Sequence, residues 1–99
     1  MRVAWTEHAV EQLDDAMAFI AVDRPGVALE WLELLLGEAE RLADFPDSGR
    51  VVPEASREDI REVIVSPYRL VYRRDSDAVF VTMVLHERQH IEPGDVVVG

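Results

Sequence analysis

The sequence contains no cysteine, no lysine and no long apolar run. Without cysteine, disulfide bonds and zinc sites with thiolate ligands are excluded. No apolar stretch approaches the ~20 residues of a membrane-spanning helix, and the N-terminus lacks the charged-then-apolar pattern of a signal peptide. We therefore expect a cytoplasmic protein, and the 99 residues predict one domain over residues 1–99.

Motifs for common catalytic and cofactor chemistry are missing as well. The sequence has no phosphate-binding glycine loop, no nucleophile elbow and no metal-binding histidine motif. His86 and His90 are four residues apart, but His86 is expected at the end of a strand, where this spacing does not favour a shared metal ion. We therefore predict neither a metal site nor a cofactor.

The charge is acidic and unevenly distributed. The net charge is −10, and all ten basic residues are arginine. Residues 1–47 hold eleven acids and three arginines (−8), whereas residues 48–99 hold nine acids and seven arginines (−2). This balance argues against general nucleic-acid or membrane binding, since nucleic-acid binding rests on the neutralisation of phosphates. The arginines either solvate the edges of a sheet or meet an acidic partner.

Three apolar runs, at residues 62–66, 68–73 and 78–86, have the composition of strands. They are rich in Val, Ile, Tyr and Phe. Pro67 separates the first two runs, and Asp75, Ser76 and Asp77 give a turn before the third. We predict a three-stranded antiparallel meander.

Alternation along these runs predicts the two faces of the sheet. The second run places three apolar residues on one face: Tyr68, Leu70 and Tyr72. In the third run, four apolar residues are predicted to share a face: Val79, Val81, Met83 and Leu85. The polar face is predicted to collect Arg69, Arg73, His86 and Arg88.

The first half of the chain has helical periodicity. Residues 2–5 are predicted as a short edge strand, and Thr6 is a suitable N-cap for the helix that follows. Residues 23–26 break the pattern, and Pro25 fits the first turn of a second helix over residues 25–43. Two helices joined by a short linker form an antiparallel hairpin, which would cover the apolar face of the sheet.

These elements predict an α+β fold: a short N-terminal strand and a two-helix antiparallel hairpin packed on a small antiparallel β-sheet. The second helix has more apolar surface than one stripe requires. Its extra leucines, Leu29, Leu34 and Leu36, either pack under the sheet or leave an exposed patch for a partner, and we expect most of them to pack. The predicted core consists of Val10, Leu13, Met17, Leu32, Leu35, Leu42, Ile64, Leu70, Tyr72, Val81 and Met83.

Four motifs in order resemble those of the ParE/RelE superfamily of toxins from bacterial type II toxin–antitoxin pairs. They are the P-x-x-G-R loop at residues 45–50, the Arg-Glu-hydrophobic strand at 61–65, Pro-Tyr-Arg-Leu-Val-Tyr-Arg at 67–73 and His-Glu-Arg at 86–88. The resemblance covers nearly the whole chain. It implies a RelE/ParE-like fold and a toxin that is neutralised by a cognate antitoxin.

One branch of this superfamily, the RelE-like toxins, cleaves messenger RNA on the ribosome. That chemistry needs an acid–base pair and cations around the scissile phosphate. By resemblance, Arg69 and Arg88 would hold the phosphate, Arg61 stands where this branch supplies lysines, and His86 or His90 would substitute for a missing tyrosine. The chain has no lysine, and residues 91–99 contain no tyrosine.

The other branch, the ParE-like toxins, binds and poisons DNA gyrase and needs no catalytic residues. We therefore predict a gyrase inhibitor rather than an enzyme. A ribonuclease, or a member that binds its antitoxin but has lost toxicity, remains the alternative. For gyrase, the second helix, the loop at Gly49 and Arg50, and Arg88 supply the contact surface.

The expected assembly is a hetero-oligomer with the antitoxin. Arginine pairs with carboxylates in a two-pronged geometry, so arginines are candidates to meet acids of the antitoxin. Trp31 is either a core residue or an anchor at the interface. The candidate residues for binding the target or the antitoxin are Arg50, Arg69, Arg73, Arg88 and Trp31. We expect no binding of free nucleic acid.

Overall fold

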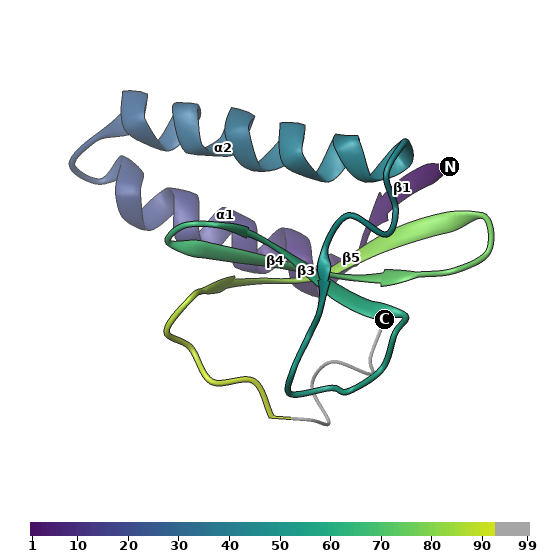
Figure 1. The fold of residues 1–99 in the computed structure, drawn as a ribbon. Helices are drawn as coiled ribbons and strands as arrows, with labels where there is room; N and C mark the ends of the chain where they lie inside the picture. Colours follow the sequence, from purple (N-terminus) through teal and green to yellow (C-terminus); the bar gives the residue numbers. More distant parts are fainter. Residues whose placement is uncertain (93–99) are drawn as a thin grey trace.

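Two helices lie on one face of a five-stranded sheet in the computed structural model, which describes residues 1–92 (Figure 1). The elements are β1 (Arg2–Trp5), α1 (Glu7–Ala21), α2 (Pro25–Glu40), a 3₁₀ turn (Arg41–Ala43), β2 (Arg50–Val51), β3 (Ile60–Val65), β4 (Tyr68–Arg74) and β5 (Ala78–His86). The predicted α+β fold is confirmed. Residues 93–99, which make up most of the C-terminal segment used in the sequence argument, lie outside the described residues.

The sheet is mixed rather than purely antiparallel. Its strand order is β1-β5-β4-β3-β2, and β1 runs parallel to β5, with Arg2 opposite Ala78. The meander β3-β4-β5 is antiparallel, as predicted. No tight turn joins β1 to its neighbour, and alternation along a strand is the same for both directions of pairing. The sequence pattern therefore did not reveal the parallel edge.

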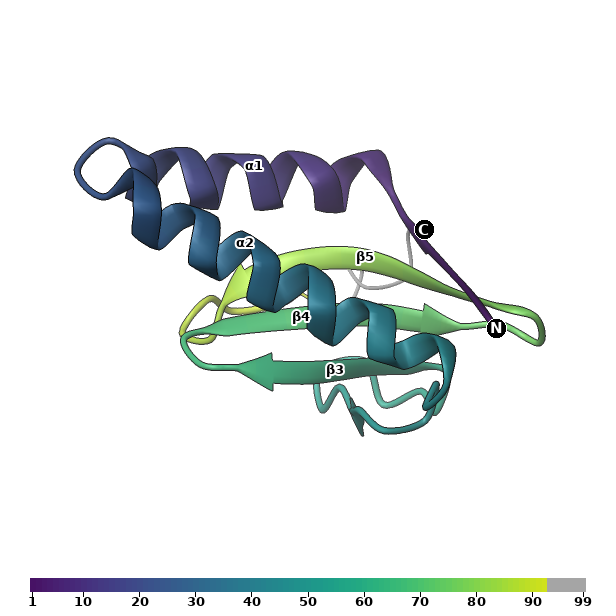
Figure 2. The ribbon, with the colours of Figure 1, turned by 90° about the horizontal axis from the view of Figure 1, so that it is seen from above.

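The helical hairpin begins where its sequence signals predict. The Thr6 hydroxyl accepts a hydrogen bond from the Ala9 N–H (3.2 Å), and Pro25 is the first residue of α2. The 3₁₀ turn extends α2 to the predicted end at Ala43. Seen from above, α2 crosses obliquely over the sheet, and the loop that joins the helices projects past the ends of the strands (Figure 2). Within residues 1–92, neither helix is long and apolar enough to span a bilayer.

The core between hairpin and sheet contains most of the residues predicted for it. Leu32 is half-buried. The prediction is confirmed for Leu13, Met17, Leu35, Leu42, Leu70, Tyr72 and Val81. It is wrong for Val10, which is 41% exposed, because α1 turns Ala9 inward instead. It is also wrong for Ile64, which is 43% exposed.

The predicted face of β3 was reversed. Val63 and Val65 pack toward the helices, so Ile64 between them points to the other side. On α2 the expected packing of three leucines is wrong too. Their exposed fractions are 56% for Leu29, 46% for Leu34 and 40% for Leu36.

A β-bulge explains the errors on β5. Val71 pairs with Met83, but the next residue, Tyr72, pairs with Val81, so Thr82 is an extra residue in the ladder. Val81 therefore faces the helices, whereas Met83 is buried on the opposite face. The same change of parity turns His86 toward the helix side, opposite Tyr68, and not onto the arginine face as predicted.

The face of the sheet away from the helices is also covered. The segments after β2 and after β5 loop beneath it (Figure 1). Its buried cluster consists of Val52, Ile60, Val71, Met83, Leu85 and Ile91. The prediction of a sheet with one open polar face is therefore wrong, because residues 52–59 and 87–92 bury its centre.

Candidate functional site

Tyr72 fixes the loop that leads from the helices to β2. Its buried hydroxyl donates to the Pro46 carbonyl (2.7 Å) and accepts from the Gly49 N–H (3.0 Å). Burial raises the pKa of this phenol, and the Gly49 N–H opposes that shift only in part. A Cβ on Gly49 would lie 2.6 Å from the Glu62 carbonyl oxygen and 2.7 Å from the Tyr72 hydroxyl. Close approach of the backbone, rather than a positive φ, requires glycine here.

The loop delivers Arg50 to the edge of the sheet. Its Nε lies 2.7 Å from Oε2 of the buried Glu62, while 62% of the Arg50 side chain stays exposed. In the described residues, its terminal amino groups donate no hydrogen bond. Arg50 is therefore held at one end and available at the other.

Arg69 lies on the far side of Glu62 and is buried. Its Nε donates to Glu62 Oε1 at 2.6 Å, and its two amino groups donate to Glu54 at 3.1 and 3.2 Å. Burial alone would lower the pKa of Arg69, but the hydrogen bonds to both carboxylates outweigh it and raise the pKa. The hydrogen bond from Arg69 lowers the pKa of Glu54. This cluster ties residues 52–59 to the sheet and uses the donors that a bound phosphate would need.

The other predicted arginines lie apart. Arg61 donates to the Glu58 and Gly49 carbonyls at 2.9 Å, which links two loops. Arg73 contacts Asp75 and stacks its guanidinium over the Phe80 ring at 4.9 Å. Arg88 is exposed in the turn after β5, where its N–H donates to His86 Nδ1. Among the predicted site residues of the described chain, the structure brings Arg50 and Arg69 together through Glu62, and Arg88 next to His86.

Trp31 belongs to an aromatic row between α2 and the sheet. Its ring meets Tyr68 edge to face with 5.2 Å between the centroids, and Tyr68 meets His86 in the same way at 6.4 Å. Burial raises the pKa of Tyr68. A hollow of about 370 Å³ opens beside this row, between α1 and the ends of β4 and β5. Trp31 is half-buried and so mainly joins helix to sheet.

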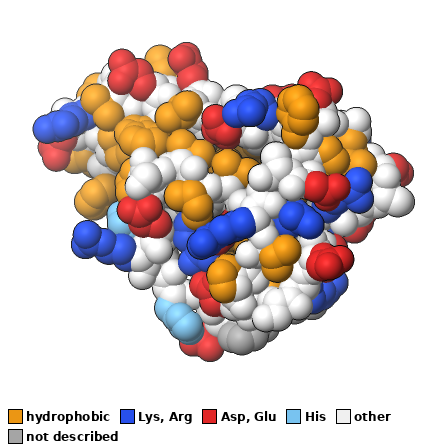
Figure 3. All heavy atoms as spheres, viewed as in Figure 1, with side chains coloured by type: hydrophobic (Ala, Val, Ile, Leu, Met, Phe, Trp, Pro, Cys, Tyr) orange, Lys and Arg blue, Asp and Glu red, His pale blue; other side chains and the backbone are white. Residues whose placement is uncertain are grey.

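The hairpin end carries apolar surface that the sequence argument missed. The exposed fractions are 83% for Phe19 and 82% for Val22. We call these two residues the hairpin patch, and Figure 3 shows apolar side chains gathered over this end of the helices among acidic ones. Phe19 lies off the periodic stripe of α1. A large aromatic residue outside the apolar stripe is the feature of the sequence that could have predicted this exposed surface.

Three residues considered above for RNA cleavage, Arg61, Arg69 and His86, do not meet on one face of the sheet. Register places Arg69 on the face of the sheet opposite to Arg61 and His86. Along β4, Arg61 pairs with Tyr72 and His86 pairs with Tyr68, which separates them by about 13 Å at roughly 3.3 Å per residue. Within residues 1–92, no three histidine or acidic side chains gather closely enough to hold a metal ion.

Comparisons with known proteins agree with this architecture. The family model described as "ParE toxin of type II toxin-antitoxin system, parDE" matches residues 3–91. The chain is 31% identical over 90 residues to "Putative toxin Y4kP" of Sinorhizobium fredii. The aligned region covers 89% of this chain and 90% of that protein. A solved structure, "Chromosomal ParDE TA system from P. aeruginosa", has a TM-score of 0.73 at 18% identity, covers 87% of this chain and 95% of that chain, and supports the fold. Because the family match spans nearly all described residues, the chain belongs to the ParE toxin family of type II toxin–antitoxin systems.

Proposed function

We propose that this ParE-family toxin acts by binding DNA gyrase, and that it does not cleave RNA. The observation that carries the proposal is the position of the groups a ribonuclease would need. Arg69 is committed to Glu54 and Glu62, and Arg61 and His86 stand at opposite ends of the sheet. A proton-transfer group contributes about 10²–10⁴-fold only when it is positioned on the reacting atoms. These separated groups favour inhibition by binding.

The charge of the hairpin supports a DNA-binding enzyme as the target. Residues 1–47, which include both helices, carry eleven acids against three arginines, a net −8. An enzyme that holds DNA presents a basic surface, which an acidic partner complements. The same charge opposes docking on ribosomal RNA. The hairpin patch would add apolar contacts at the centre of this acidic surface.

We further propose a cognate antitoxin as the partner that silences the toxin. The structurally similar P. aeruginosa protein is described as part of a ParDE toxin–antitoxin system. Leu29, Leu34 and Leu36 remain exposed along α2. Phe19 and Val22 remain exposed at the C-terminal end of α1, just before the loop to α2. Apolar surface of this kind is typical of a protein–protein contact.

A supercoiling assay beside an in vitro translation assay, both with the purified chain, tests the target. We expect loss of gyrase supercoiling at toxin concentrations that leave translation intact, and weaker inhibition as salt rises. Phe19→Ser should reduce the inhibition, whereas Ile64→Ser, at an exposed apolar position (43%) on the sheet, should not. Loss of translation with cut messenger RNA would establish the ribonuclease instead, and no effect in either assay would establish a member without toxicity.

Co-expression with the short reading frame beside the gene tests the antitoxin. We expect the two proteins to co-purify and the complex to leave supercoiling unchanged. A toxin that remains active in the presence of every neighbouring gene product would contradict the proposal.

A further inference from the structure

β5 has a free edge beyond its short pairing with β1. β1 pairs with β5 only from Ala78 to Val81, and the chain then turns into α1. The remaining stretch, residues 82–86, pairs with β4 on one side, and within residues 1–92 no strand lies on its other side. A free edge is a template for pairing with another chain unless its backbone groups are protected. The N–H groups of this edge therefore need a partner of their own.

Two glutamine side chains supply that partner. Gln12 reaches over from α1, and its Oε1 accepts a hydrogen bond from the Val84 N–H at 2.8 Å. Gln89 reaches back from the turn after β5, and its Oε1 accepts from the His86 N–H at 2.8 Å. Backbone N–H groups two residues apart point to the same side of a strand, so both carboxamides act on one edge. They are the only carboxamide side chains in the sequence, which contains no asparagine.

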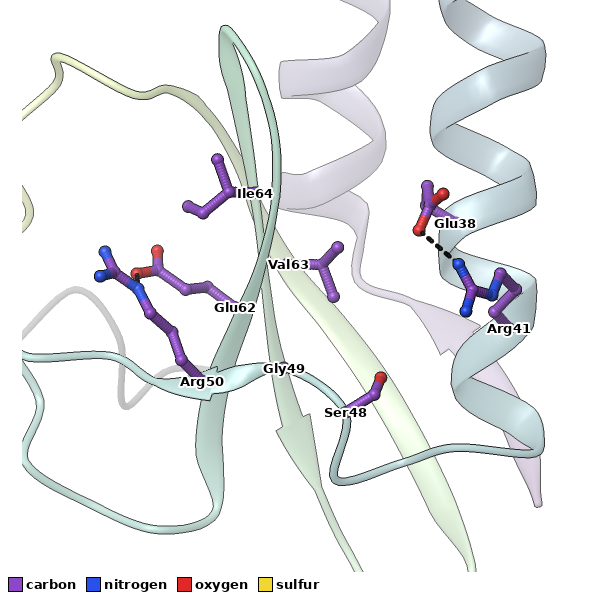
Figure 4. Close-up of a pocket in the computed structure, with 8 residues that line it drawn as sticks. All are labelled: Glu38, Arg41, Ser48, Gly49, Arg50, Glu62, Val63 and Ile64. Atoms are coloured by element: carbon purple, nitrogen blue, oxygen red, sulfur yellow. Dashed lines mark hydrogen bonds and ion pairs between the residues drawn. The ribbon is translucent and has the colours of Figure 1, made fainter.

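The opposite edge of the sheet has no such cap. β2 pairs with β3 only at Arg61 and Glu62. Figure 4 shows the edge beyond them, where Val63 points toward α2 and Ile64 points to the other side. Both carboxamides of the chain lie on β5, so neither reaches this shorter free stretch, residues 63–65. The glutamines therefore protect the longer of the two free edges.

The free stretch of β5 is complementary to itself. An antiparallel pair of two such stretches would place Val84 opposite its own counterpart and Thr82 opposite His86. Residues 82–86 contain no acid and no arginine, although the chain carries a net charge of −10. β5 ends at His86, so the second copy's strand would stop before it reached Val81, where β1 already pairs. The length and the charge of the free edge therefore fit a second copy of this chain.

We propose that Gln12 and Gln89 hold this edge closed against a second copy of the chain and so keep the toxin monomeric. In an antiparallel β5–β5 pair, the N–H groups of Val84 and His86 would donate to carbonyl groups of the second copy. While a carboxamide oxygen occupies each N–H, every hydrogen bond that pairing forms there replaces one that breaks, so pairing gains little. Both glutamines also line the hollow next to Phe19, and a monomer leaves that surface accessible. The inference concerns the toxin alone and does not depend on its target or its antitoxin.

The double variant Gln12→Met/Gln89→Met tests the caps. Methionine keeps an unbranched side chain and lacks the carboxamide oxygen. We expect the purified variant to dimerise in sedimentation equilibrium at least about tenfold more tightly than the wild type, since two N–H groups in each chain gain a partner and each contributes about 2–10-fold. Glu11→Met/Arg88→Met is the matched control. It adds two methionines at neighbouring exposed positions, leaves the net charge unchanged and should associate as the wild type does.

Amide hydrogen exchange shows which edge is involved. The Val84 and His86 N–H groups should exchange slowly in the wild-type monomer. In the double variant they should exchange fast when dilute and slowly once the dimer forms. A double variant that associates no more than the wild type or the control, or a dimer that protects Ile64 of β3 instead, would overturn the inference. Fast exchange of Val84 and His86 in the wild type would also overturn it, and this readout needs no variant to fold.

Discussion

Replacing Gly49 by alanine is expected to loosen the whole Arg50 loop. The added methyl group would lie 2.6 Å from a backbone carbonyl and 2.7 Å from the Tyr72 hydroxyl, so the loop must move. Such overpacking costs about 1–3 kcal/mol. The movement also breaks the buried hydrogen bond between Gly49 and Tyr72, which costs about 1–3 kcal/mol more. We expect Gly49→Ala to lower the free energy of unfolding by about 2–6 kcal/mol in total.

Urea unfolding measures this loss directly. A domain of this size has a total stability of about 5–15 kcal/mol, so the midpoint should fall by roughly 1–3 M. Gly37→Ala is the matched control, because a Cβ at this exposed position in α2 meets nothing within 4 Å. It should stabilise the protein by about 0.5–1 kcal/mol, since alanine is the better helix former.

A double variant separates the two contributions. Tyr72→Phe removes one of the atoms that the new methyl group meets, so part of the cost of Gly49→Ala should disappear in that background. The Glu62 carbonyl remains, and the rest of the cost should remain with it. A Gly49→Ala protein that unfolds at the urea concentration of the wild type would refute this account of the loop.

Three further changes test other parts of the structure. Arg69→Ala removes the partner of Glu54 and of Oε1 of the buried Glu62, whose Oε2 keeps Arg50, and should cost about 3 kcal/mol in urea unfolding, against less than about 1 for the exposed Arg57→Ala. The lowered pKa of Glu54 stabilises the fold fully above the ordinary value of 4.5, and this contribution is lost as pH falls through the folded value; Glu54→Gln should flatten the stability–pH curve there. Leu34→Gln, on the exposed side of α2, should change stability by less than about 0.5 kcal/mol.

The elements themselves were predictable because their signals are local. Thr6 and Pro25 mark the starts of the two helices, and the alternation from Tyr68 to Tyr72 marks β4. Each signal depends on neighbours within one turn or one strand. The faces of β3 and β5 were not predictable in the same way. Where consecutive residues are all apolar, as at Val63-Ile64-Val65, alternation does not choose a face. The bulge at Thr82 lies between apolar residues on both sides, which give no sign of a change in pairing.

The site was less predictable because it depends on contacts between distant residues. Alternation placed Arg69 on the correct face, but its burial follows from Glu54 and Gln89, which two separate segments bring over it. The sequence therefore suggested a free arginine. Arg50 differs: the sequence named it as a candidate binding residue and its side chain is 62% exposed, but its attachment to Glu62 depends on the way in which Tyr72 holds the loop.

The parallel pairing of β1 with β5 has a consequence for how the toxin appears during synthesis. The N-terminal strand pairs with the last strand, and contacts such as the one between Thr6 and Thr82 join residues 76 positions apart. The helical hairpin can form early from local contacts, but the sheet lacks an inner strand until residues 78–86 have left the ribosome. β5 then pairs with β1 on one side and with β4 on the other, and so joins the N-terminal strand to the rest of the sheet. The surface that depends on the finished sheet therefore forms only after β5 has been synthesised, whereas the surface of the helical hairpin can form before it.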